Sequence, residues 1–179
     1  MGNPYRGDDG VGPAVARRVA TLLERVPAAR DDRARHRAVP TVQVLAGVAD
    51  PLDLVGRWDD AALAIVLDAA RSGGPVGSVT VVEGAGLAGS ADATPTAHDP
   101  GDPGLTSTHG LGIVAVIRLA RAMGNAPRRV VLVTVTGADF RRSDALSPAV
   151  AAAVEHAASL VLGLLVDRVP ASPGPPGPW

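Results

Sequence analysis

The sequence has no cysteine, few aromatic residues and almost no net charge. The absence of cysteine from the 179 residues excludes disulfides, thiolate metal sites and a cysteine nucleophile. Aromatic residues make up 2% of the chain, which argues against nucleic-acid modules that stack bases on aromatic rings. A net charge of −1 gives no electrostatic reason to bind nucleic acid or an anionic membrane. The core must therefore be built from Val, Leu, Ala and Ile.

Targeting and membrane signals are also missing from the sequence. No basic segment followed by an apolar one opens the chain, and we find no apolar run of about 18 residues. Together with the lack of cysteine, this predicts a cytoplasmic protein that does not associate with membranes. The length predicts one domain over residues 1–167, followed by a disordered tail rich in proline over residues 168–179.

Helices are predicted where apolar residues recur every three or four positions. The predicted helices cover residues 11–26, 50–55, 109–123 and 148–167. Asp8 or Asp9 stands at the N-cap position of the first, Asp50 at that of the second and Ser147 at that of the last. Gly124 follows the third helix, where glycine commonly ends a helix.

Strands are predicted from β-branched and continuous apolar segments. The predicted strands cover residues 41–45, 62–67, 76–83 and 129–135. An apolar run without alternation, as at 62–67, is typical of a strand buried on both faces of a parallel sheet. The order of elements therefore predicts a three-layer α/β fold with a mostly parallel sheet and helices on both faces. Residues 28–40 and 84–108 are predicted loops.

Three polar residues fall where ligands gather in such folds, beyond the carboxyl ends of the strands. Asp9 lies in the opening loop, Asp68 closes the strand at 62–67, and His109 begins the third helix. Two carboxylates and one imidazole at one sheet edge predict an open site for a divalent metal, namely nickel, zinc, iron or manganese.

Each of these residues also has a purely structural interpretation. Asp8 and Asp9 suit helix capping, and an aspartate at the end of a strand, such as Asp68, commonly caps a loop. His109 suits a capping or surface position next to its polar neighbours. On the residues alone, the metal site and the structural alternatives both stand.

Other residues carry weaker signals. His98, in the long loop, is a weaker candidate ligand, while His36 and His156 are interpreted as surface residues. Ser107 and Ser147 are not surrounded by the Gly-x-Ser-x-Gly turn of a hydrolase nucleophile. No phosphate-binding loop of the Gly-Lys-Ser/Thr type occurs, and the opening glycines do not have the dinucleotide-binding spacing.

Four motifs, in order along the chain, resemble those of the hydrogenase maturation endopeptidase family. They are GNPYRGDDGVG at 2–12, VLDAA at 66–70, STHGLG at 107–112 and LSPAV at 146–150. The first motif is highly specific, and the other three are persuasive only together. The resemblance extends to about Val166.

This resemblance implies an endopeptidase that removes the C-terminal extension of a nickel-loaded precursor of the nickel–iron hydrogenase large subunit. The precursor is then the partner, and nickel, or another divalent metal, is supplied by that substrate. The resemblance implies metal contacts at Asp9, Asp68 and His109 and a metal- or substrate-metal-dependent, aspartate-type peptidase. The group that performs the cleavage stays open. Supporting positions in the opening motif are Asp8, Asn3 and Gly10.

The sequence departs from the family pattern in two places. Family members have an apolar strand before the opening motif, whereas this sequence starts with Met1, so we expect the central N-terminal strand to be missing and the true start to lie upstream. Ala46-Gly47 and residues 141–144 differ in loops on the substrate side, which leaves the particular hydrogenase open. The alternatives are a non-cleaving binder of nickel or precursor, and an unrelated α/β hydrolase or metalloenzyme.

Overall fold

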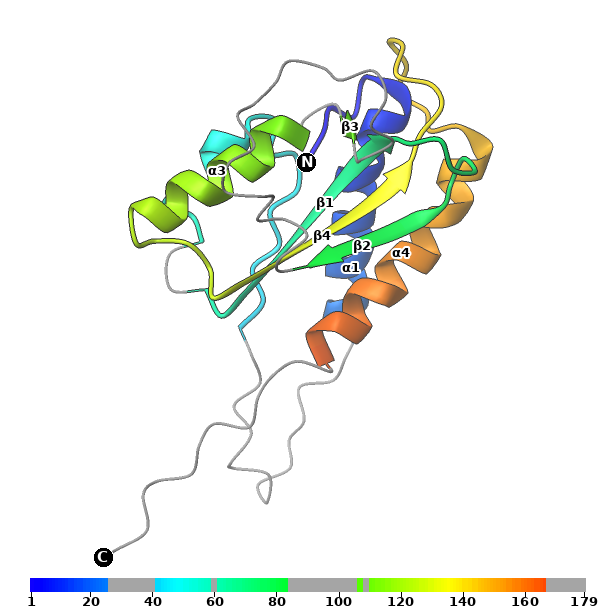
Figure 1. Ribbon diagram of the computed structural model, residues 1–179. Helices are drawn as coiled ribbons and strands as arrows, with labels where there is room; N and C mark the ends of the chain where they lie inside the picture. The colour runs from blue at the N-terminus through cyan, green and yellow to red at the C-terminus, as the bar shows by residue number, and fades with distance from the viewer. Residues whose placement is uncertain (26–40, 59–60, 84–105, 108–109, 167–179) are drawn as a thin grey trace, which may run out of the picture.

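The computed structural model describes residues 1–25, 41–58, 61–83, 106–107 and 110–166 (Figure 1). The predicted loop at 28–40, nearly all of the loop at 84–108 and the predicted tail lie outside the described residues. The same is true of three histidines, His36, His98 and His109.

The described strands form one mixed sheet in the order β2-β4-β1-β3. The strands are β1 (Leu63–Arg71), β2 (Val79–Glu83), β3 (Thr106–Ser107) and β4 (Arg129–Thr136). β1 and β4 run parallel at the centre, because the chain between them crosses over through a helix. β2 and β3 run antiparallel on the two edges. The predicted α/β class is confirmed, and its parallel part is this central pair.

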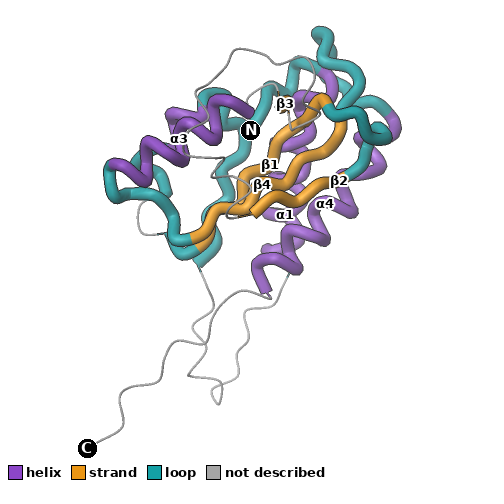
Figure 2. Tube along the Cα trace, in the orientation of Figure 1, coloured by secondary structure: helices purple, strands orange, loops and turns teal. Residues whose placement is uncertain are grey.

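Helices cover both faces of the sheet, as Figures 1 and 2 show. α1 (Val11–Glu24) and α4 (Pro148–Val166) lie on one face, and α3 (Gly110–Ala122) and the short 3₁₀ helix η2 (Pro51–Leu54) lie on the other. The first face is filled mainly by valine and alanine, and the second by isoleucine, leucine and valine. The predicted three layers and aliphatic core are therefore confirmed.

The predicted strand at 41–45 is wrong. Residues 41–49 have no regular secondary structure, and Leu45 and Val48 pack on the core beneath α3 instead. A β-branched segment becomes a strand only when another strand supplies hydrogen bonds, and none of the described strands pairs with it. β3 was not predicted, because a strand of two residues leaves no pattern.

Residues 1–5 are likewise not part of a strand. Met1 is buried against the core beneath α3, and its α-amino group donates to the carbonyl of Leu67 in β1. The chain thus enters the fold alongside the central strand. The expectation of an upstream start stays a prediction.

α4 is long and apolar enough to cross a membrane by length and composition, although Glu155 and His156 interrupt its apolar residues. Its 19 residues include a window of mean hydropathy 1.9, of which 28% is buried. The inner side of α4 contributes Val150, Ala157 and Val161 to the core. Core helices of soluble proteins meet the same criterion, so this is weak evidence for a membrane span.

Candidate functional site

The opening motif forms a 3₁₀ helix, η1, over Gly7–Gly10 directly before α1. Its two carboxylates, on Asp8 and Asp9, are both buried, with exposed fractions of 0% and 1%. Neighbouring residues of a 3₁₀ helix point about 120° apart, so these two side chains serve different surroundings. The predicted capping of α1 by either of them is wrong, because its N-cap is Gly10 and no side chain caps it.

The Asp9 side chain is held by the chain that precedes it. Its Oδ2 accepts a hydrogen bond from the Asn3 backbone N–H at 3.0 Å. Gly2 passes so close that a Cβ there would lie 2.0 Å from the Asp9 carbonyl oxygen, at a φ of +108°. The Asn3 side chain accepts from the Tyr5 N–H at 2.9 Å and fixes the next turn. Glycine and asparagine in the motif therefore shape the loop around Asp9.

Asp68 lies within β1, not at its end as predicted. The strand continues to Arg71 because β4 pairs with it as far as Ala70 and β3 pairs with its last two residues. The Asp68 side chain is buried (1% exposed), and its Oδ1 accepts from the backbone N–H of Ala69 at 2.9 Å. The carboxylate thus sits near the carboxyl end of the central strand, with a shift of a few residues from the predicted boundary.

Asp9 and Asp68, far apart in sequence, both lie close enough to the Met1 amino group to influence it. Both carboxylates act electrostatically on the α-amino nitrogen of Met1. Burial lowers the pKa of that amino group, and Asp68 and Asp9 oppose this shift by raising it. Both carboxylates therefore lie near the Met1 amino group, and their joint place in a metal site stays a prediction.

His109 lies outside the described residues, so its predicted place beside the carboxylates stays a prediction. It falls in sequence between Ser107, whose strand pairs with the end of β1, and Gly110, where α3 begins. Over the described ranges, no three His, Cys, Asp or Glu side chains form a group that could hold a metal.

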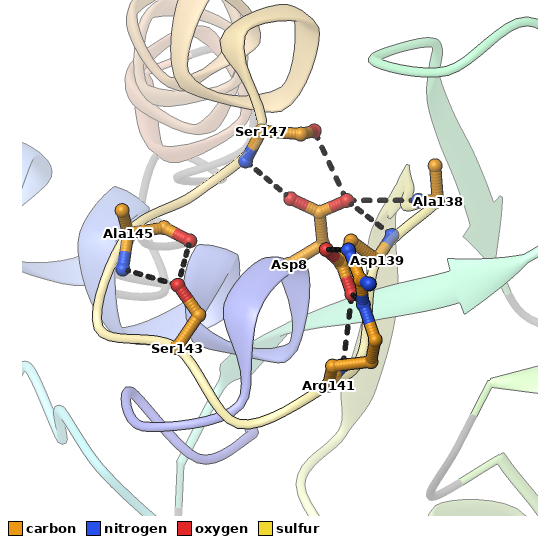
Figure 3. Close-up of polar contacts among 7 residues, drawn as sticks. All are labelled: Asp8, Ala138, Asp139, Arg141, Ser143, Ala145 and Ser147. Carbon is orange, nitrogen blue, oxygen red and sulfur yellow. Dashed lines mark hydrogen bonds and ion pairs between the residues drawn. The ribbon is translucent and has the colours of Figure 1, made fainter.

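Asp8 holds together segments that are distant in the sequence (Figure 3). Its carboxylate accepts hydrogen bonds from the backbone N–H groups of Ala138, Asp139 and Ser147 and from the Ser147 hydroxyl. Burial raises the pKa of Asp8, but these hydrogen bonds more than offset it, and the net pKa is lowered. Its partners are over 100 positions away, so no sequence pattern could have revealed them.

A surface hollow of about 250 Å³ lies between residues 41–49, which have no regular secondary structure, and η2. It is lined by residues 44–48 together with Asp53 and Arg57. Ala46-Gly47, one of the two departures from the family pattern, belongs to this lining. Neither Asp9 nor Asp68 contributes to it.

The fold is a three-layer α/β domain with two buried carboxylates, Asp68 near the carboxyl end of β1 and Asp9 in η1. The family model HycI, described as hydrogenase maturation protease, matches residues 18–164. The chain belongs to this family and is therefore a maturation peptidase. The matched residues begin after the opening motif, so the assignment does not depend on Asp8 or Asp9.

Solved structures of maturation endopeptidases share the fold. The hydrogenase maturating endopeptidase HybD from E. coli is 21% identical with a TM-score of 0.67, over 94% of this chain and 90% of that chain. The [NiFe] hydrogenase maturation protease HybD from Thermococcus kodakarensis is 18% identical with a TM-score of 0.64, over 92% and 94%. A hydrogenase 2 maturation peptidase from a Thaumarchaeota archaeon is 25% identical with a TM-score of 0.51, over 92% and 93%. A search of curated proteins finds no match.

Proposed function

We propose that this peptidase removes the C-terminal extension of a nickel–iron hydrogenase large-subunit precursor after nickel has been inserted. Nickel enters as part of the substrate, and Asp9, Asp68 and His109 contact it. The proposal makes cleavage dependent on the metal in the precursor. The cleavage takes place in the cytoplasm, a reducing compartment that suits a chain without cysteine.

The burial of Asp9 and Asp68, both near the Met1 amino group, is the observation that supports the proposal. Carboxylate oxygens and an imidazole nitrogen are suitable ligands for nickel. Two or three such groups can complete the coordination of a metal that the precursor already holds. The family membership supplies the reaction, and the buried carboxylates supply a place where a cation is favoured.

The carboxylates have two tasks in this proposal. They orient the nickel-bearing part of the precursor, so that the scissile peptide bond lies beside the metal. A metal in that position polarises the carbonyl or activates a water molecule. Asp9 or Asp68 accepts the proton of the attacking water as a general base, which makes the enzyme an aspartate-type peptidase.

The proposal is tested by incubating the protein with nickel-loaded and nickel-free precursor. The loaded precursor should lose a C-terminal fragment, seen by mass spectrometry, and the nickel-free precursor should stay intact. Cleavage of both forms would contradict the dependence on nickel. A stable complex without cleavage would favour the alternative function, a non-cleaving binder.

The assigned residues are tested with single substitutions. His109→Ala and Asp68→Asn should each reduce processing at least 100-fold, because removing a direct metal contact costs at least as much as removing an outer partner. Glu24→Gln, an exposed acid at the end of α1, is the matched control and should process normally. Circular dichroism should show that the variants are folded. Normal processing by folded His109→Ala would contradict the metal contact.

A further inference from the structure

The Asp8 carboxylate joins the opening motif to the loop between β4 and α4. Its Oδ2 accepts from the N–H groups of Ala138 and Asp139 at 2.8 and 2.9 Å and from the Ser147 hydroxyl at 3.0 Å. Its Oδ1 accepts from the Ser147 N–H at 2.7 Å. Ser147 directly precedes the first residue of α4. We call Asp8 and these three partners the Asp8 clamp (Figure 3).

The chemistry of the clamp requires a carboxylate. All four neighbouring groups are donors, and an ionised carboxylate is the side chain that offers only acceptors. An asparagine of the same shape has one acceptor oxygen, and its NH₂ group would face a donor on one side of the clamp. Negative charge is also favoured at the N-terminal end of α4, where backbone N–H groups point toward it.

The loop that receives Asp8 is itself firmly held. Phe140, next to Asp139, is buried in the core of the α1–α4 face. The Arg71 guanidinium lies 4.1 Å from the centre of its ring. The clamp therefore attaches the opening motif to a fixed part of the molecule and not to a free surface loop.

Backbone contacts carry this attachment to Asp9. The Asp8 N–H donates to the Asp139 carbonyl at 2.7 Å, and the Gly7 N–H donates to that of Ser143 at 2.9 Å. Gly7 has a φ of +57°, and a Cβ there would lie 2.5 Å from the Asp139 carbonyl oxygen. Asp8 and Asp9 are neighbours in one short 3₁₀ helix, so fixing the first also fixes the direction of the second.

We propose that Asp8 is a positioning residue for the peptidase reaction, whose clamp aims the Asp9 carboxylate at the substrate's nickel. This inference rests on the proposed function, which assigns Asp9 to the metal. It gives the start of α4 and the turn at residues 138–139 a role in catalysis through their hydrogen bonds to Asp8.

The test compares two clamp variants with two controls. Asp8→Asn removes one of the two acceptor oxygens of the clamp. Ser147→Ala removes only the hydroxyl donor, and it replaces Asp8→Asn as the test if that variant does not fold. Ser143→Ala is the matched control, because among the residues that the structure describes the Ser143 hydroxyl bonds only to Ala145, within its own loop. Val161→Ala destabilises the core about 20 Å along α4 from the clamp and controls for lost stability.

Two readouts are measured on each protein: the affinity of the isolated protein for Ni²⁺, from an NMR titration, and kcat and KM for nickel-loaded precursor. Asp8→Asn should lower the Ni²⁺ affinity and kcat about 10-fold or more, with KM unchanged, as for other residues that orient a ligand. Ser147→Ala should lower both about 2- to 5-fold, equivalent to one hydrogen bond. Ser143→Ala and Val161→Ala should match the wild type in both.

Wild-type Ni²⁺ affinity and kcat in folded Asp8→Asn and Ser147→Ala would overturn the inference alone. An equal loss of Ni²⁺ affinity and kcat in Val161→Ala would also overturn the inference, because the losses in the clamp variants would then follow from reduced stability. If the wild type neither bound Ni²⁺ nor processed the precursor, the proposed function would fail and the inference would fail with it. The wild-type measurement therefore separates the two failures.

Discussion

At the residue scale, the opening motif shows two adjacent aspartates with different tasks. Asp9 accepts a hydrogen bond from the start of the chain, and Asp8 accepts its hydrogen bonds from the loop before α4. The division follows from the geometry of a 3₁₀ helix, which sends consecutive side chains in different directions. Sequence identified both aspartates as important, but it could not distinguish their partners.

Gly7 and Gly124 both have a positive φ but differ in how closely other atoms approach them. Gly7→Ala should destabilise the protein by about 3 kcal/mol or more, because left-handed backbone strain adds to a clash with the Asp139 carbonyl. Gly124→Ala has the same kind of φ, +75°, but an open surrounding, and should cost only about 1 kcal/mol. Urea denaturation measures both. Equal losses would show that the close approach at Gly7 is unimportant.

At the element scale, α1 and α4 pack together and support the sheet from one side. They share the core of valine and alanine, and the Arg18 guanidinium of α1 bonds both oxygens of Glu155 of α4 at 2.6 and 2.8 Å. This ion pair is exposed at the surface, so the buried aliphatic contacts stabilise the helix pair more than the charges do.

The inner side of α4 should therefore respond strongly to truncation. Val161→Ala should lower the free energy of unfolding by about 2 kcal/mol, because the buried side chain loses apolar contact and leaves a cavity. Val166→Ala, on the same helix but 78% exposed, should change it by less than about 0.5 kcal/mol. Thermal or chemical denaturation would measure the difference. A small loss for Val161→Ala would show that α4 is not a core helix.

The loop between β4 and α4 contains an ion pair with a defined pH dependence. Hydrogen bonds from the Arg141 side chain and backbone lower the pKa of Asp139 from 3.8 to about 2. A lowered pKa in the folded state gives stability that is present above about pH 4 and is lost as the pH falls toward 2. Arg141→Ala should thus lower the melting temperature at pH 7, and the difference from wild type should shrink toward pH 2.

Arg142→Ala, an exposed neighbour in the same loop, is the control for this experiment. Its melting temperature should differ from the wild type by an amount that does not change between pH 4 and pH 2. A difference for Arg141→Ala that stays constant over this range would contradict the assigned ion pair.

At the scale of the whole molecule, the described sheet has two central and two edge strands. β1 and β4 each pair on both sides, whereas β2 and β3 pair on one. Amide hydrogens of β1 and β4 should therefore exchange most slowly and those of β2 much faster, since edge strands open more easily. Exchange measured by mass spectrometry tests this, and equal protection of β2 and β4 would contradict the strand order.

Helices and buried strands were predictable because their signals are local. The apolar periodicity of α1 and α4, the run of β4 and the cap of η2, where the Asp50 side chain accepts from the Leu52 N–H, were read correctly from neighbouring residues. The segment at 41–45 has the local signal of a strand without a described partner. A strand requires hydrogen bonds from elsewhere in the chain, which its own residues do not encode.

The sequence by itself determined the class of fold, the aliphatic core and the opening motif with its two aspartates. Tertiary structure alone decided that Asp9 and Asp68 both lie near the Met1 amino group and that Asp8 holds the start of α4, where its partner Ser147 is 139 positions away. The physical reason is that composition, periodicity and capping act between near neighbours. Hydrogen bonds and charges between distant segments depend on how the whole chain packs.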